Sequence, residues 1–198
     1  MFALDDYTLL KYLKARDFDV KRASKILYEH LEFRRNYRPE ELTLASPGVF
    51  EEALPMGTSL KGNAVLAFRV RTYNPSMYTK ESFLVSRVYE VEQAHRRMAL
   101  AGWKSDRIMC ISDLGGYRLL KHANPHALYL QRQVLEVFQT LYRDKLEAVL
   151  IVNSPAVFQG IWSLMRGWFK PETAKRVVFI NDFSELQQYI APEEIYKQ

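Results

Sequence analysis

The sequence contains a single cysteine, Cys110, among its 198 residues. One thiol excludes an internal disulfide and a zinc site made of several thiolates. Cys110 lies in the apolar run RIMCIS, where we expect a buried and unreactive thiol. The N-terminal stretch MFALDDYTLLKY is too charged for a secretory signal. These features predict a cytoplasmic protein without disulfides.

Long apolar runs and the common catalytic motifs are missing as well. No run reaches the roughly 18 apolar residues of a bilayer-spanning helix, so we expect none. The chain has no Gly-x-Ser-x-Gly elbow, no His-Glu-x-x-His pair and no Walker loop. His122 and His126 have helical spacing, but Pro125 disturbs it, and we expect both to face solvent. The sequence predicts no enzyme, no metal and no cofactor.

Asp113 supports the alternative hypothesis that the protein is an enzyme. It follows an apolar run and precedes Gly115 and Gly116, which could cradle a phosphate. The carboxyl ends of parallel strands are where α/β enzymes place catalytic groups. A hydrolase or phosphatase that uses Asp113 therefore stays open, beside a purely structural aspartate that ends a strand.

The sequence is rich in aromatic and basic residues. Apolar residues make up 48% and charged residues 26%, as in a globular protein, and aromatic residues reach 13%. Such aromatics fill a large core or line a ligand cavity. The formal net charge of +5 favours an anionic partner. Basic and acidic residues alternate without a zinc-finger or RNA-recognition signature, so we expect no nucleic acid.

The periodicity changes along the chain. Residues 8–18 and 20–37 have apolar residues at helical spacing, and 46–55 reads as a short surface helix closed by Pro55. From there short apolar runs alternate with longer amphipathic segments, which predicts an α/β fold with a mostly parallel sheet. We expect a helical lobe over 1–50 and a second domain over 51–198. The predicted strands are 62–71, 107–112, 147–155 and 176–182, and the predicted helices of this domain are 78–102, 126–143, 160–169 and 183–190.

The segment GIWSLMRGWF, residues 160–169, is unusually apolar on one side. Its large side chains cover an arc of roughly 160° on a helix, and two of them are tryptophans beside Arg166 and Lys170. Tryptophan next to cations suits a lipid or membrane boundary. On the residues alone, a core helix and a helix that faces a ligand or membrane remain equal alternatives. The apolar residues are Ile161, Trp162, Leu164, Met165, Trp168 and Phe169.

Three segments together resemble the CRAL-TRIO lipid-binding family. LLKYLKARDFDVKRASKIL (9–27) resembles the N-terminal helical signature of the family, and ISDLGG (111–116) resembles its strand that ends in Asp-Leu-x-Gly. Residues 141–180 resemble the segment in which a Tyr-Pro-Glu-type turn leads to a strand, an Asn-x-Pro, a mobile gate helix and a basic exit. The resemblance covers nearly the whole chain and implies a sheet that forms the floor of a lipid pocket. It also implies that 160–169 is the gate helix, and we expect the pocket to be lined by Leu66, Ile108, Cys110 and Phe138.

The phosphatidylinositol-transferring branch of the family implies a set of headgroup residues. Its arginine, acid, threonine and lysine positions correspond here to Arg16, Asp144, Thr173 and Arg176. Arginine binds phosphate through two parallel hydrogen bonds, so both arginines are chemically suitable. Arg143 replaces the usual proline of the turn, and Asp144 is shorter than the usual glutamate. The hydroxyl residues of the phosphatidylcholine site are replaced by Ile108 and Cys110, which favours phosphatidylinositol with an apolar second ligand, or a purely apolar ligand.

The resemblance therefore predicts a monomeric carrier that binds one lipid in a closed apolar pocket. We expect it to transfer or present phosphatidylinositol and to touch acidic membrane surfaces transiently, as a cytoplasmic, peripheral membrane protein. One alternative is a carrier of a neutral tocopherol- or retinoid-like molecule. Another, favoured by the abrupt ends of the chain, is a lipid-sensing regulatory module of a larger protein.

Overall fold

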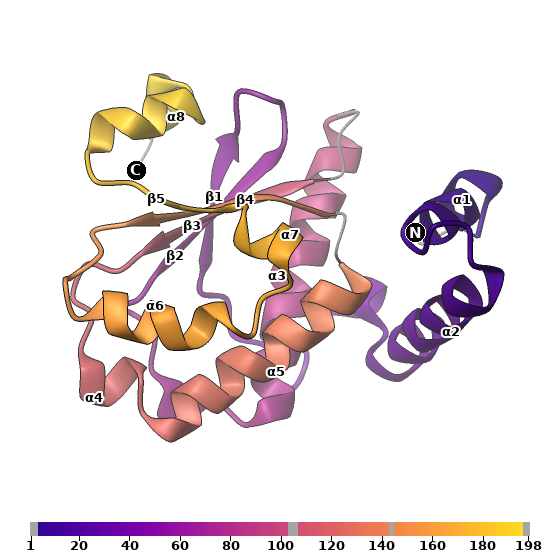
Figure 1. Ribbon diagram of the computed structural model, residues 1–198, viewed down its shortest axis with the longest axis horizontal. Helices are drawn as coiled ribbons and strands as arrows, with labels where there is room; N and C mark the ends of the chain where they lie inside the picture. Colours follow the sequence, from indigo (N-terminus) through magenta and orange to yellow (C-terminus); the bar gives the residue numbers. More distant parts are fainter. Residues whose placement is uncertain (1–3, 103–106, 143–144, 196–198) are drawn as a thin grey trace. The chain divides into compact units, whose positions relative to one another are not determined.

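The computed structural model describes residues 4–102, 107–142 and 145–195 (Figure 1). The chain forms two compact units, residues 1–43 and residues 44–198. The first unit is helical, and the second contains the sheet and the remaining helices.

The first unit contains helices α1 (Asp6–Lys14) and α2 (Val20–Tyr37), followed by the 3-10 turn η1 (Pro39–Glu41). The Asp19 carboxylate accepts a hydrogen bond from the Arg22 amide (3.0 Å) and caps α2. Asp17 and Phe18 have positive φ angles of 52° and 62°. This left-handed pair reverses the chain between the helices.

The second unit contains one sheet of five strands in the order β1-β2-β3-β4-β5. β2 to β5 run parallel, and β1 pairs antiparallel with β2. The predicted α/β fold with a mostly parallel sheet is confirmed. The bounds are β1 (Ala53–Thr58), β2 (Ala64–Arg69), β3 (Ile108–Asp113), β4 (Leu146–Val152) and β5 (Val177–Phe179).

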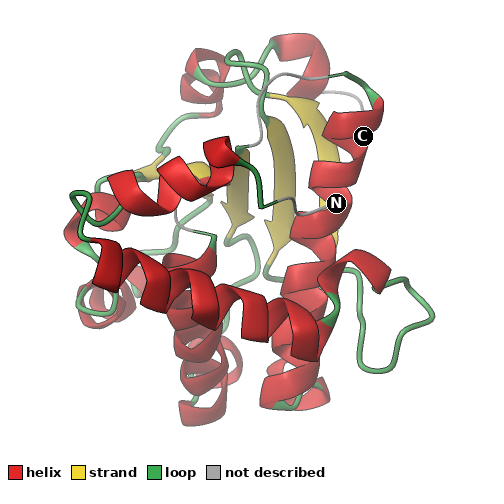
Figure 2. Cartoon of the chain, turned by 90° about the vertical axis from the view of Figure 1, so that its right-hand side faces the viewer, coloured by secondary structure: helices red, strands yellow, loops and turns green. Residues whose placement is uncertain are grey.

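Helices and 3-10 turns complete the described part of the second unit. Helix α3 begins with a capping box between Thr79 and Ser82, and α5 begins with the side-chain cap Asn124 before Pro125. The bounds are η2 (Pro75–Met77), α3 (Lys80–Leu100), α4 (Leu119–His122), α5 (Pro125–Leu141), α6 (Phe158–Arg166), α7 (Pro171–Ala174), η4 (Phe183–Gln188) and α8 (Pro192–Ile195). Figure 2 shows the strands side by side with helices packed around them.

The short helix predicted over 46–55 is wrong. Gly48 has a positive φ of 76°, and Ala53 already begins strand β1. The amides of Glu52 and Ala53 donate to the Glu90 carboxylate on α3, each at 2.8 Å. Tertiary hydrogen bonds to α3 and β2 thus replace the local helical bonds that the sequence pattern favours.

The two faces of the sheet are covered by different elements (Figure 1). One face, the outer face, packs against η4 and the segment after it through Leu186 and Ile190. The opposite face, the inner face, lies toward α6, whose Phe158 joins Leu114 and Ile151 in a buried cluster. The outer-face cluster contains Val65, Ala67, Met109, Ile111, Ala148, Leu150, Ile180, Leu186 and Ile190.

Candidate functional site

Strand register fixes which side chains share the inner face. Residues paired across parallel strands point to the same side of the sheet, and successive residues alternate. Ile151 is in the inner cluster with Phe158 of α6, so the residues two positions before it also face inward. One inner row that runs across four strands consists of Leu66, Cys110, Val149 and Val177.

The middle of this row is not closely packed. On the outer face, Met109 is 1% exposed and Leu150 is 0% exposed. Their chain neighbours Cys110 and Val149 point inward and are only half-buried, as is Val177. Cys110 lies on the central strand of the sheet, so a close-packed cover would exclude water from it. The inner face of β3 to β5 therefore keeps accessible apolar surface beside α6.

The inner row becomes closed toward β2. Leu66 is 4% exposed and Ile108 is 2% exposed, and the guanidinium of Arg87 on α3 lies 5.0 Å from the ring centre of Phe68. Arg87 also pairs with the carboxylates of Glu52 (3.3 Å) and Glu90 (3.0 Å). Burial raises the pKa of Glu90 and the Arg87 charge opposes that shift. This ion cluster joins α3 to the start of β1 and closes one side of the inner face.

Cys110 is a chemically quiet part of the inner face. Burial raises the pKa of its thiol to about 12, so the thiol stays protonated at neutral pH and is a poor nucleophile. The prediction of an unreactive cysteine fits this environment. Phe138 of α5, the fourth predicted lining residue, is half-buried and stacks on Tyr142 with ring centres 4.9 Å apart.

Helix α6 turns its aromatic side toward the inner face. The Trp162 ring lies 5.6 Å from Phe179 of β5 and 5.4 Å from Phe169, and Ile161 packs beside it on the inner cluster. Leu164 is 55% exposed, whereas Met165 and Trp168 are half-buried. The helix ends at Arg166, three residues before the end of the apolar run. Among the predicted gate residues, Leu164 is thus exposed to solvent, and the side chains of the others are partly buried.

Gln139 of α5 holds the segment that follows α6, and the sequence reading missed it. Its amide nitrogen donates to the Trp168 carbonyl (3.0 Å) and its amide oxygen accepts from the Lys170 backbone amide (2.6 Å). The Lys170 ammonium also donates to the Gln139 carbonyl oxygen (3.3 Å). Gln139 is 6% exposed. A glutamine at a core position of an otherwise apolar helix face was the signal for such a role.

Two of the four predicted headgroup residues come together in the structure. Thr173 lies in α7, and its carbonyl accepts a hydrogen bond from the Arg176 amide (3.0 Å). The Arg176 guanidinium donates to the carbonyl of Leu146 at the start of β4. Arg16 belongs to the first unit, where it donates to the Ala15 carbonyl (2.6 Å). Asp144 lies outside the described residues.

The opposite, carboxyl edge of the sheet contains Asp113. Its carboxylate accepts hydrogen bonds from the Gly115 amide (2.9 Å) and from the Asn153 side chain (2.8 Å). These bonds shape the turn after β3 and join it to the turn after β4, which accounts for the residue structurally. His122, expected to face solvent, is instead 7% exposed, because it packs between the rings of Tyr73 and Tyr117.

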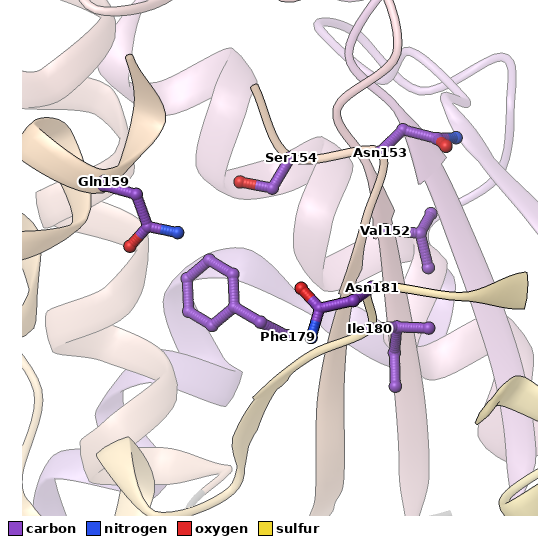
Figure 3. Close-up of a pocket in the computed structure, with 7 residues that line it drawn as sticks. All are labelled: Val152, Asn153, Ser154, Gln159, Phe179, Ile180 and Asn181. Carbon is purple, nitrogen blue, oxygen red and sulfur yellow. The ribbon is translucent and has the colours of Figure 1, made fainter. Parts of the chain in front are cut away.

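A small pocket of about 200 Å³ lies at the carboxyl ends of β4 and β5 (Figure 3). Ser154, Gln159 and Asn181 direct polar groups toward it, and Phe179 forms one wall. This volume is below the roughly 300–1,000 Å³ of ordinary ligand pockets, so the pocket alone does not hold a lipid. Its lining residues are Val152, Asn153, Ser154, Gln159, Phe179, Ile180 and Asn181.

Within the part of the chain that the structure describes, none of the helices has the length and the apolar character that crossing a bilayer requires. Among the same residues, no three His, Cys, Asp or Glu side chains gather in a way that could hold a metal ion.

Known proteins with similar sequences point in one direction. The mouse protein named alpha-tocopherol transfer protein-like is 27% identical over 181 residues, which cover 88% of this chain and 51% of that protein. The human protein of the same name is 26% identical over the same length. This chain therefore spans about half the length of these curated relatives.

A solved structure and two family profiles complete the comparison. The crystal structure of Sfh5 superimposes with a TM-score of 0.76 at 19% identity, covering 91% of this chain and 66% of that one, which shows the fold. Residues 1–29 match the N-terminal domain profile of the CRAL/TRIO family, and residues 54–198 match the profile of the CRAL/TRIO domain itself. The chain belongs to the CRAL/TRIO domain family.

Proposed function

We propose that this chain binds one lipid between the inner face of the sheet and α6, and carries it between membranes without covalent chemistry. The observation that carries the proposal is the half-buried apolar surface of Cys110, Val149 and Val177 in the middle of the sheet. On the outer face of the same strands, Met109, Ala148 and Leu150 are buried, and partly buried residues such as Val152 and Val178 lie around them. Apolar surface kept open beneath a helix is suited to an apolar ligand.

The free energy of lipid binding at such a site favours reversible exchange of the lipid with a membrane over permanent retention in the protein. Each CH₂ group removed from water contributes about 0.8 kcal/mol, but an acyl chain is equally dry in a bilayer. Transfer from membrane to protein is therefore close to neutral in free energy. The rate is then set by how easily α6 moves away from the inner face, and Gln139 holds the end of that segment.

Phosphatidylinositol is the lipid that we propose first. Thr173 and Arg176 lie in one turn at the amino end of β5, and we propose that a phosphate binds to the Thr173 hydroxyl and the Arg176 guanidinium there. A lipid phosphate must be paired when it leaves water, because an unpaired buried charge is prohibitive. Arg16 of the first unit and Asp144, outside the described residues, stay predictions.

A neutral lipid is the second candidate, and two observations favour it. The Arg176 guanidinium already donates to the Leu146 carbonyl, so phosphate binding would have to compete with that bond. The mouse and human relatives are named for similarity to an alpha-tocopherol transfer protein. A neutral molecule with one hydroxyl would need no arginine.

The carrier proposal also includes the partners expected from the sequence. We propose a cytoplasmic monomer that touches acidic membrane surfaces only while it loads or releases lipid. A lipid-sensing module inside a longer protein would use the same site, with the bound lipid acting as a signal.

Native mass spectrometry of the purified chain tests the proposal. After incubation with vesicles that contain phosphatidylinositol and α-tocopherol, we expect one added lipid mass per chain. Phosphatidylinositol supports the first candidate and tocopherol the second. A chain that takes up neither lipid would contradict the carrier function.

A headgroup variant separates the two candidates further. We expect Thr173→Asp combined with Arg176→Ala to abolish phosphatidylinositol uptake, since it adds a negative charge and removes a positive one. The same variant should leave tocopherol uptake unchanged. Thermal melts followed by circular dichroism check that the variant still folds after the loss of the bond from Arg176 to Leu146. Unchanged phosphatidylinositol uptake would show that Thr173 and Arg176 do not bind the headgroup.

A further inference from the structure

One corner of the second unit exposes large apolar side chains away from the proposed lipid site. Leu120 is 90% exposed and Leu119 is 41% exposed on the short helix α4, and Met77 of η2 is 60% exposed. Tyr129, near the start of α5, is 46% exposed. In Figure 1, α4 lies at the lower left beside the beginning of α5.

Direct contacts join the elements of this corner. The Tyr73 ring, just before η2, stacks on His122 of α4 with ring centres 6.3 Å apart. The His126 ring nitrogen lies 3.0 Å from the Tyr78 carbonyl, which ties the start of α5 to η2. Tyr117 packs edge-on against Phe158 (5.4 Å), which brings α4 beside the start of α6. The elements that carry the exposed apolar side chains are therefore packed against one another.

The corner is predominantly basic. Segments 69–80, 114–135 and 153–171 contain eight lysines and arginines and no aspartate or glutamate. Asp113 borders these segments, and its carboxylate accepts hydrogen bonds from Gly115 and Asn153. Arg118 and Lys121 directly flank the two leucines of α4, and Arg71 lies against the turn at Gly116, where an added Cβ would meet its side chain at 3.2 Å.

We propose that α4 is a membrane anchor that inserts Leu119 and Leu120 into the surface of a bilayer rich in anionic lipid. Exposed leucines between cations on a short helix suit the boundary between acyl chains and acidic headgroups. Protein interfaces are depleted in lysine and in acidic residues, whereas here Arg118 and Lys121 stand directly beside the exposed leucines. The charge pattern thus selects an anionic lipid surface as the occupant.

The membrane anchor gives the proposed lipid carrier a docking element. The biological role of the anchor rests on the proposed function, but its binding to membranes does not. Anchoring by α4 would place the carboxyl edge of the sheet and the start of α6 at the membrane, since Tyr117 joins α4 to Phe158. Docking can be measured without any transferred lipid. Its failure therefore leaves lipid uptake intact, and failure of uptake leaves docking intact.

Vesicle co-sedimentation of the purified chain tests the anchor. The vesicles contain phosphatidylcholine alone or phosphatidylcholine with phosphatidylserine. We expect binding to the anionic vesicles that weakens with added salt, and a loss of about tenfold or more for Leu119→Ser combined with Leu120→Ser. Arg118→Gln and Lys121→Gln should each weaken binding to anionic vesicles by about fivefold.

Leu100→Ser is the matched control. Leu100 is 89% exposed at the end of α3, which leads toward the amino edge of the sheet, and this change should leave vesicle binding unaltered. Equal binding by the wild type and the Leu119→Ser, Leu120→Ser variant would overturn the proposal. Equal, salt-independent binding to vesicles of phosphatidylcholine alone would contradict the proposal that the anchor recognises anionic lipid. A concentration-dependent dimer in light scattering that the same double variant abolishes would show instead that a second copy covers α4.

Discussion

The two faces of the sheet are built from alternate residues of the same strands, yet they are packed differently. On β4, Leu150 points outward and is 0% exposed, while Val149 next to it points inward and is half-buried. On β3, Met109 and Cys110 show the same contrast. Equally apolar residues on one strand thus serve two purposes. The outer face stabilises the fold, and the inner face is available to a ligand.

The comparison predicts unequal stability losses on the two faces. Leu150→Ala should lower the free energy of unfolding by about 2–5 kcal/mol, because a closed core cannot fill the lost volume. Val149→Ala should cost about 1 kcal/mol or less, because its methyl groups are only partly removed from water. Urea unfolding of both variants measures the difference. Similar losses would mean that the inner face is as closely packed as the outer one.

The hydrogen bonds between Gln139 of α5 and the segment after α6 predict a smaller and more local effect on stability. Gln139→Leu removes the side-chain bonds to Trp168 and Lys170, each worth about 1 kcal/mol. We expect amide hydrogen exchange over 166–170 to become about tenfold faster, with faster release of a bound fluorescent lipid. Gln133→Leu on the same helix is the control and should change neither rate. Unchanged hydrogen exchange in the Gln139 variant would show that Gln139 does not restrain α6.

Much of the fold followed from local patterns in the sequence. Alternating apolar runs and amphipathic segments predicted the four parallel strands and the long helices, because burial imposes those periods. The first strand was missed because the bonds that hold it lie outside the stretch itself. It pairs with the following strand β2, and Glu90 on α3 accepts the amides of Glu52 and Ala53. A local reading of 46–55 could not contain those bonds.

The candidate site was only partly predictable, for a similar reason. The apolar side of 160–169 was evident, but which of its residues face the sheet depends on where the helix ends, at Arg166. Leu66 and Ile108, expected to line the pocket with Cys110, are almost fully buried near Arg87 and α3, and their place in the pocket stays a prediction. Gln139 could be recognised only once Trp168 and Lys170 were seen beside it.

One paired measurement tests most directly whether the inner face receives a lipid. Cys110→Phe adds a ring to the inner face, and Ile111→Phe adds bulk to the closed outer face, at neighbouring positions of β3. We expect Cys110→Phe to keep a melting temperature close to that of the wild type and to lose the added lipid mass in native mass spectrometry. Ile111→Phe should lose about 1–3 kcal/mol of stability, and the fraction that stays folded should still take up one lipid. Unchanged lipid uptake by Cys110→Phe, at unchanged stability, would contradict the account.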